Sequence, residues 1–418
     1  MISPPTQRIL WIWYTPFGLG GVETFLLQTA RACVENGVEM YLATVQTNVG
    51  PLHSGLEATG VHLLDWSAFY PAYMNQTSTA IFQKRLIDDL KTIRPTTIVV
   101  NGCTDFATGI APLLRRVKPF CTILDVFHID PPDEKYVNLR SPYIDVVDGI
   151  VSSNASAFKR LHTRFPSTRN LPTRYIPYAA NVPDRPRRQP NEVLRLLYVG
   201  RLVQEQKRIL ELPAVLDALR RSGRRFEMTI VGDGADAGTL KERLQELGLQ
   251  NLVSFVGYVE PDRVMDYLFD HDVLLNLSTY EGFSISIIEA FAAGCVPVCT
   301  RLPGLDPAVF LDGETCRLCP LNGLDHMCSL LQELTPENLK FMSGNACRIG
   351  RQFTVKRMTE AYREFLGELQ KRRPVKEWDE AANLSCVWDM TKHNPWIPHT
   401  NPFKQWVRRN FGRLFRRV

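Results

Sequence analysis

Residues 280–294 read YEGFSISIIEAFAAG, and the rest of the chain is organised around them. An apolar run at residues 273–277 comes directly before. The spacing predicts a strand, a short acidic loop with Gly282 and a helix whose first N–H groups point at one place, which suits an anion. Glu281 would precede that helix and Glu289 would lie about two turns into it, so the carboxylates would meet opposite ends of one ligand. The alternative is that both are ordinary solvated charges beside a helix.

The same half of the chain supplies a cationic loop. A strand is predicted at residues 194–199, and Gly200, Arg201 and Lys207 follow it. Two cations just beyond a parallel strand can converge on a diphosphate. Lys and Arg are also common surface residues, but the position of this loop relative to Glu281 favours the phosphate interpretation.

The first half of the chain repeats the pattern of strand, loop and helix. Residues 8–14 (RILWIWY) read as a buried strand, and Gly20-Gly21 precede a helix that starts near Val22. Glycine at that point lets the backbone approach a ligand at the helix N-terminus. Further strands are predicted at residues 38–45, 97–101, 121–127 and 149–153. Alternating strands and helices indicate parallel sheets covered on both faces in each half.

His128 ends the apolar run at residues 123–127. Ligands of parallel sheets bind beyond the carboxyl ends of the strands, so the imidazole would face the expected crevice. A lone histidine is also often structural or simply exposed, and both interpretations stay open.

Composition narrows the possible classes of protein. The 418 residues carry a formal net charge of +5, and residues 390–418 contain seven Lys or Arg and no acid. The basic character therefore belongs to the C-terminal end, and no nucleic-acid partner is expected. The apolar run near the N-terminus is too short for a signal segment, so the protein is expected in the cytoplasm, with ten reduced cysteines.

Two short strings could suggest a metal. Cys316 and Cys319 form a C-x-x-C without two further ligands, so zinc is not expected. Asp270-His271-Asp272 contains D-x-D but precedes a strand, at the sheet edge opposite the crevice, and is interpreted as a solvated turn. Neither a metal nor another cofactor is expected.

Taken together and in order, the motifs resemble one family, the retaining glycosyltransferases of the GT-B fold with a GGVE loop and an E-x7-E signature (glycosyl transferases group 1, family four). The segments that carry the resemblance are GGVE at residues 20–23, His128, Gly200-Arg201 with Lys207, VGDG at residues 231–234, and Glu281 to Glu289.

The resemblance implies an α/β GT-B fold, in which two doubly wound Rossmann-like domains face each other across a cleft, with a C-terminal crossover helix. The expected division is an acceptor domain at residues 1–182, a linker at 183–190, a nucleotide-sugar donor domain at 191–352, a crossover helix at 353–372 that returns to the first domain, and a basic amphipathic tail at 373–418.

The resemblance also implies residue roles. Arg201 and Lys207 would hold the donor diphosphate, Glu289 the ribose, and Glu281 with the backbone of Gly282-Phe283 the sugar hydroxyls. The expected catalytic residues are His128, Arg201, Lys207 and Glu281, and the expected donor-binding residues are Gly20, Gly21, Gly200, Arg201, Lys207, Glu281, Gly282, Phe283, Ser284 and Glu289. The sequence departs from the family at Ser284, at residues 303–307 (PGLDP) and at Cys316, which leaves the donor sugar open.

The tail beyond the crossover helix has its own pattern. In residues 403–418 apolar side chains recur at helical spacing among arginines. Such a helix either docks on the protein itself or lies on an anionic membrane surface, which would place the enzyme at the inner face of the membrane.

The function expected from these features is metal-independent, retaining transfer of a sugar from a UDP- or GDP-linked donor to a glycan or lipid-linked hydroxyl acceptor. Cell-surface glycan or lipopolysaccharide assembly is the expected setting. The alternatives are a nucleotide-sugar-binding scaffold without turnover and a glycoside hydrolase that uses Glu281 and Glu289. A hydrolase would have no use for a site built from Arg201 and Lys207.

Overall fold

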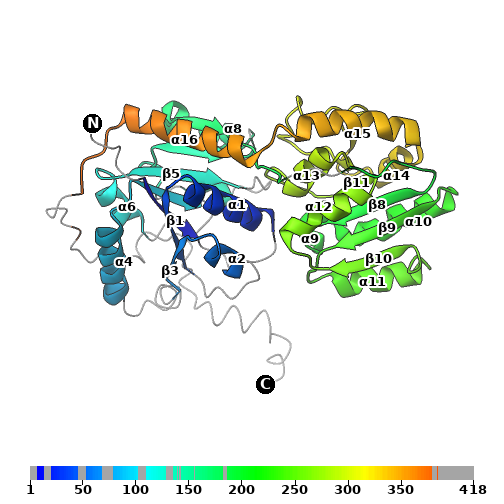
Figure 1. Cartoon of the computed structure of the whole chain (residues 1–418), viewed down its shortest axis with the longest axis horizontal. Helices are drawn as coiled ribbons and strands as arrows, with labels where there is room; N and C mark the ends of the chain where they lie inside the picture. Colours follow the sequence, from blue (N-terminus) through cyan, green and yellow to red (C-terminus); the bar gives the residue numbers. More distant parts are fainter. Residues whose placement is uncertain are drawn as a thin grey trace, which may run out of the picture.

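The structure, a computed structural model, describes residues 7–13, 20–45, 53–67, 79–101, 110–128, 135–138, 140, 143–154, 156–181, 186–378 and 384. Within these ranges the chain forms two parallel sheets, each flanked by helices and lying beside the other (Figure 1).

The first sheet has seven strands in the order β3-β2-β1-β4-β5-β6-β7. Its strands are β1 (Arg8–Trp13), β2 (Glu39–Thr44), β3 (His62–Asp65), β4 (Thr97–Asn101), β5 (Thr122–Phe127), β6 (Gly149–Ser152) and β7 (Thr173–Tyr175). The helices of this part are α1 (Gly21–Glu35), α2 (His53–Glu57), α4 (Thr79–Ile93), α6 (Ala111–Val117), α7 (Lys135–Asn138), α8 (Ser156–Arg164) and the 3-10 helix η1 (Pro166–Asn170).

The second sheet has six strands in the order β10-β9-β8-β11-β12-β13. Its strands are β8 (Leu194–Val199), β9 (Phe226–Val231), β10 (Val253–Gly257), β11 (Val273–Asn276), β12 (Val296–Thr300) and β13 (Arg317–Cys319). The helices that follow are α9 (Gln204–Lys207), the 3-10 helix η2 (Ile209–Glu211), α10 (Leu212–Arg221), α11 (Ala237–Glu246), α12 (Pro261–Asp270), α13 (Ile285–Ala293), α14 (Leu324–Gln332), α15 (Pro336–Gly350) and α16 (Val355–Arg372).

The central strands are apolar on both faces because helices cover both sides of each sheet. β5 is buried along its whole length, and β8 is buried at five of its six positions. Strand order reverses between β1 and β4 in the first sheet and between β8 and β11 in the second. Ligands of open parallel sheets bind at such switch points, so the loops after β1, β8 and β11 occupy the expected places.

The crossover helix α16 leaves the second sheet and lies along the first (Figure 1, orange). Its Leu369 packs at the start of β6, where a Cβ atom placed on Gly149 would lie 2.7 Å from Leu369 Cδ1. Where the chain crosses between the two parts, the Ala180 N–H donates to the carbonyl of Phe353 at 2.9 Å. The predicted fold class of two doubly wound sheets with a returning helix is confirmed.

The first residues of the stretch 373–418 pack against the first sheet. The Arg373 guanidinium pairs with Asp148, with Nη2 2.7 Å from Oδ2, and the Trp378 indole N–H donates to the carbonyl of Pro95 at 3.0 Å. Leu384 is buried in the same core. Residues 385–418, including the predicted amphipathic segment, lie outside the described residues. No helix in the described part is long and apolar enough to cross a membrane.

Candidate functional site

The loops that follow β8 and β11 meet at the switch point of the second sheet, and Gln206 ties them together. Its Oε1 atom accepts a hydrogen bond from Arg201 Nη2 at 2.8 Å, and its Nε2 atom donates to the carbonyl of Tyr280 at 3.2 Å. Its own carbonyl accepts from the Thr279 N–H at 2.8 Å. Arg201 is therefore oriented by the backbone of the loop that carries Glu281.

Lys207 and Glu281 form an ion pair between Nζ and Oε1. The same carboxylate oxygen accepts a hydrogen bond from Ser278 Oγ at 2.6 Å. The side chains of Lys207 and Glu281 are only 14% and 12% exposed, so the pair is weakly screened by water. Two of the expected phosphate and sugar ligands thus hold each other in place.

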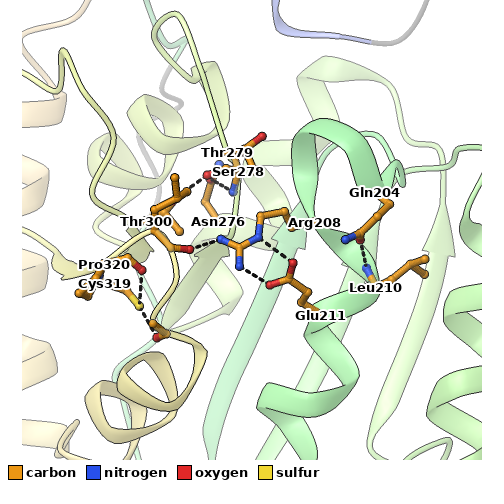
Figure 2. A network of polar contacts seen from close by, with 12 residues as sticks. Gln204, Arg208, Leu210, Glu211, Asn276, Ser278, Thr279, Thr300, Cys319 and Pro320 are labelled. Carbon is orange, nitrogen blue, oxygen red and sulfur yellow. Dashed lines mark hydrogen bonds and ion pairs between the residues drawn. The ribbon is translucent and has the colours of Figure 1, made fainter. Parts of the chain in front are cut away.

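Further polar contacts hold the segments that follow β8 and β11 (Figure 2). Thr300 Oγ1 donates to the carbonyl of Ser278 at 2.6 Å, and Arg208 Nε donates to Glu211 Oε1 at 2.8 Å. Arg208 has a φ of 52°, in the left-handed region that non-glycine residues rarely adopt. Its double contact with Glu211 holds this turn, and with it the end of α9, where Lys207 lies.

Glycines let the loops after β8 and β9 lie against each other. Gly232 has a φ of 133°, and a Cβ atom on it would lie 2.0 Å from the carbonyl oxygen of Gly200. Gly234 is similarly close to the backbone of Leu202. The expected donor-binding residue Gly200 is therefore part of a backbone contact that excludes side chains.

The helix α13 begins opposite α1. Gly282 and Phe283 are buried at its entry. The N-cap Ser284 makes no side-chain capping bond, and its hydroxyl lies 3.0 Å from that of Ser286. A Cβ atom on Gly21, the first residue of α1, would lie 3.6 Å from the Cβ of Ile285. The predicted glycine loop and the predicted E-x7-E helix thus meet across the two halves of the molecule.

Glu23 also lies at this junction, although it was not predicted to have a role beyond completing the GGVE motif. Its Oε2 atom would be 2.6 Å from a Cβ atom on Gly20, so the carboxylate lies against this glycine and would have to shift if a side chain were added there. Burial raises the pKa of Glu23, while its own backbone N–H and the nearby Arg201 oppose that shift. The Glu23 carboxylate, in the first domain, therefore interacts electrostatically with Arg201 in the second.

Glu289 is buried in α13, with 7% of its surface exposed. Burial raises its pKa to about 8, with a further contribution from the nearby carboxylate of Asp262. A buried carboxyl group that lacks a cation has a strong tendency to take up a proton or to accept hydrogen bonds from a ligand. This environment suits the predicted contact with ribose hydroxyl groups.

His128 lies in the first domain at the end of β5. Its Nδ1 atom is 2.8 Å from the Tyr178 hydroxyl, and its ring packs edge-on to Phe25. Burial, aided by Arg140, lowers its pKa to about 3, so the imidazole is neutral at physiological pH. The structure thus brings Arg201, Lys207 and Glu281 together, and places His128 in an aromatic cluster beside α1.

The interpretation of Asp270-His271-Asp272 as a solvated turn is wrong. Asp272 is fully buried and its Oδ1 atom lies 3.2 Å from Arg195 Nη2, while His271 Nε2 is 2.8 Å from Thr229 Oγ1. These side chains stabilise the edge of the sheet that lies opposite the site, through the contacts with Arg195 and Thr229. No cluster of three or more His, Cys, Asp or Glu side chains suited to a metal occurs in the described part of the chain.

Gln206, Ser278 and Glu23 are the residues of this site that the sequence interpretation did not select. The Gln206 side chain bonds to the carbonyl of Tyr280, 74 residues later in the sequence, and nothing near Gln206 in the sequence indicates that partner. The Ser278 hydroxyl bonds to Glu281, three residues later, but a serine in a loop gives no signal by its type alone. Glu23 alone could have been found, because it completes the GGVE motif.

Comparisons with known proteins agree with this architecture. The family model described as glycosyl transferases group 1 matches residues 184–331. Glycogen synthase from Mycobacterium tuberculosis is 34% identical over 143 residues, which is 34% of this chain and 33% of that protein. The aligned part therefore spans about a third of the length of this curated relative.

Solved structures extend the likeness to most of the chain. Sucrose-phosphate synthase from Thermosynechococcus elongatus has a TM-score of 0.68 at 18% identity and covers 87% of this chain and 100% of its own. Anabaena HepE in complex with UDP-glucose has a TM-score of 0.68 at 16% identity and covers 86% and 99%. At such low identity these structures show the fold alone. The chain therefore has the GT-B fold, and its residues 184–331 match the family model of the glycosyl transferases group 1.

Proposed function

We propose that this protein is a glycosyltransferase that moves a sugar from a nucleotide-diphosphate sugar to a hydroxyl group of an acceptor, with retention of configuration. The observation that carries the proposal is the meeting of Arg201, Lys207 and Glu281 at the switch point of the second sheet. Gly21 of the first half lies against Ile285 at the start of α13, four residues after Glu281. Two cations, two helix N-termini and a carboxylate form a place for a diphosphate joined to a sugar.

The charges define the role of each group. Arg201 and Lys207 would stabilise the negative charge that grows on the leaving diphosphate, which is the electrostatic part of catalysis. Glu281 would accept hydrogen bonds from sugar hydroxyls and Glu289 from the ribose. Because Lys207 and Glu281 pair with each other in the free protein, donor binding must insert phosphate and sugar atoms between or beside them.

The retaining reaction would proceed on one face of the sugar. The leaving diphosphate oxygen takes the proton of the acceptor hydroxyl as the new glycosidic bond forms, and the bond from the anomeric carbon to the diphosphate breaks. We propose that this needs no metal, since two side-chain cations meet the diphosphate. His128, neutral and held by Tyr178, would present an uncharged polar edge toward the reacting sugar.

Thermal shift with UDP, GDP and ADP sugars tests the donor site. We expect one nucleotide sugar to raise the melting temperature of the wild type and to lose this effect in Glu289→Ala, with or without EDTA. Glu246→Ala, an exposed glutamate on α11 of the same domain, is the matched control and should respond like the wild type. If no nucleotide sugar shifts the wild type, the donor-site assignment is wrong.

Turnover separates an enzyme from a scaffold. Release of nucleoside diphosphate on addition of an acceptor, followed by proton NMR of the product, should show the same anomeric configuration in donor and product. A product of opposite configuration would leave transfer standing and overturn retention. Inhibition by EDTA would overturn metal independence.

The relatives support a role in glycan assembly. One similar structure, with a TM-score of 0.65 at 16% identity, is a lipopolysaccharide outer core galactosyltransferase. A relative from Salmonella typhimurium, 35% identical over 101 residues, is a lipopolysaccharide 1,6-galactosyltransferase. We propose a cell-surface glycan or a lipid-linked molecule as the acceptor and the inner face of the membrane as the place of action.

The basic C-terminal segment would bring the enzyme to such an acceptor. Each Lys or Arg close to an anionic surface adds about 1 kcal/mol to binding. We expect the full chain to cosediment with vesicles containing anionic lipid, and a chain that ends at Lys392 to lose most of that binding. The cut leaves Trp378 and Leu384, which pack on the first domain, in place.

Charge and apolar contact can be separated with the same assay. Replacing the five arginines of residues 403–418 by glutamine should weaken binding to anionic vesicles and reduce its dependence on salt, with Lys404 left in place. Neutral vesicles serve as the control surface. Equal sedimentation of the full and shortened chains would exclude the membrane role of this segment.

A further inference from the structure

Four successive residues of the loop after β11 are each held by a hydrogen bond. The carbonyl of Ser278 accepts from Thr300, the N–H of Thr279 donates to the carbonyl of Gln206, and the carbonyl of Tyr280 accepts from the Gln206 side chain. All these partners belong to the second domain.

The fourth residue, Glu281, is held from the first domain. Its carbonyl oxygen accepts from Nδ2 of Asn154 at 3.4 Å. Asn154 lies just after β6 and is 3% exposed. It is 127 residues from Glu281 in the sequence. The residue proposed to bind the donor sugar thus depends on the acceptor domain for its backbone position.

The orientation of the Asn154 amide follows from its other contacts. Its Oδ1 atom lies 2.9 Å from the N–H of Ser156, which can only donate, and 2.8 Å from the Ser156 hydroxyl. The oxygen must therefore face Ser156, and the NH₂ group points to Glu281. The Asn154 side chain thus accepts hydrogen bonds from Ser156, at the start of α8, through its oxygen. Through its nitrogen it donates to Glu281 in the other domain.

Gly304 of the second domain leaves room for the Asn154 side chain. Gly304 has a φ of 84°, and a Cβ atom placed there would lie 2.1 Å from Asn154 Oδ1 and 2.7 Å from Ser156 Oγ. Gly304 belongs to the PGLDP stretch where the sequence departs from its family. In the same interface the ring of Tyr175 meets that of Phe283 edge-on, with centroids 6.3 Å apart.

We propose that Asn154 is a positioning residue: it holds the main chain of Glu281 from the acceptor domain when the two domains are closed, in addition to the contacts that Lys207 and Ser278 make with the carboxylate from the donor domain. The inference rests on the proposed transferase function and adds to it a link between domain closure and the donor sugar. It also gives the PGLDP stretch a purpose, as the surface that leaves room for Asn154.

The test uses Asn154→Asp in the full chain, which keeps an oxygen for Ser156 and loses the NH₂ donor. Asn170→Asp, an exposed residue of η1, is the matched control for charge. In the ligand-free protein we expect hydrogen–deuterium exchange of residues 278–284 to become about 10-fold faster in Asn154→Asp, because the loop loses a contact to its main-chain carbonyl and opens more often. Unchanged exchange would overturn the proposal.

Kinetics give the second measurement. With the active donor, kcat of Asn154→Asp should fall about 10- to 100-fold, because the carboxylate is misplaced, while the dissociation constant of the free nucleoside diphosphate stays within about 2-fold. An equal loss of nucleotide affinity, or wild-type kcat, would overturn the positioning role. If the wild type transfers no sugar at all, the proposed function fails, and the exchange experiment still decides whether Asn154 holds the loop.

Discussion

At the scale of single residues, Glu289 shows how a binding site works against stability. Its carboxyl group is buried, and its pKa is about 8 in the folded protein against an ordinary value of 4.5. Between these two values the folded state binds a proton that the unfolded state has released. The free energy of unfolding therefore falls as pH rises through this window. Above it, the buried carboxylate is charged and destabilises the folded state.

Replacing Glu289 with glutamine should remove that cost. At about pH 9 we expect the free Glu289→Gln variant to exceed the wild type in free energy of unfolding by about 2 to 4 kcal/mol, and the difference should shrink toward about pH 5. Denaturant unfolding across this pH range measures it, and Glu246→Gln should follow the wild type. A constant difference at all pH values would mean that Glu289 does not titrate in this window.

Some contacts of single residues could be predicted from the sequence and others could not. Arg201, Lys207 and Glu281 could be predicted to converge, because each follows a parallel strand and such strand ends share one edge. The pairing of Asp272 with Arg195 could not, because nothing in a D-x-D string indicates a cation 77 residues earlier. Asn154 was missed for the same reason: its importance arises only where two domains touch.

At the scale of elements, the site is a set of loops braced by backbone contacts. The loop after β8 carries Arg201 and Lys207, and the loop after β9 supports it from behind. The N–H of Leu202 donates to the carbonyl of Asp233 at 2.9 Å, and the N–H of Asp236 donates to the carbonyl of Leu202 at 3.0 Å. The position of Arg201 therefore depends on a neighbouring loop that carries no predicted ligand.

Gly232→Ala tests this support. Its Cβ atom would overlap the carbonyl of Gly200 at an unfavourable φ, so we expect a loss of about 2 to 4 kcal/mol in unfolding free energy. Gly238→Ala, at an open position in α11, is the control and should add about 0.4 to 1 kcal/mol. Thermal unfolding compares them. Equal stability of the two variants would show that the loops are not in contact.

At the scale of the whole molecule, the apolar runs were enough to predict a parallel sheet in each half of the chain, and the resemblance to a family implied the returning helix. The strand-like runs became β1, β2, β4, β5 and β6 in one sheet and β8 and β11 in the other. The division at residues 182 and 190 stays a prediction. Sequence could not show that Arg187 of the linker is tied to the second domain, where its Nη2 atom donates to the carbonyl of His271 at 2.9 Å.

The crossover helix makes the two halves depend on each other, and a pair of substitutions can test its seat on the first sheet. Gly149→Ala pushes a methyl group to within 2.7 Å of Leu369 Cδ1, and should cost about 1 to 3 kcal/mol. Leu369→Ala leaves a cavity and should cost about 2 to 5 kcal/mol. In the double variant the new methyl group occupies part of that cavity, so the combined loss should be smaller than the sum by about 0.5 to 3 kcal/mol. Chemical denaturation of the four proteins gives this coupling energy. Strictly additive losses would mean that α16 does not pack on β6, and that the chain does not return to its first domain in solution.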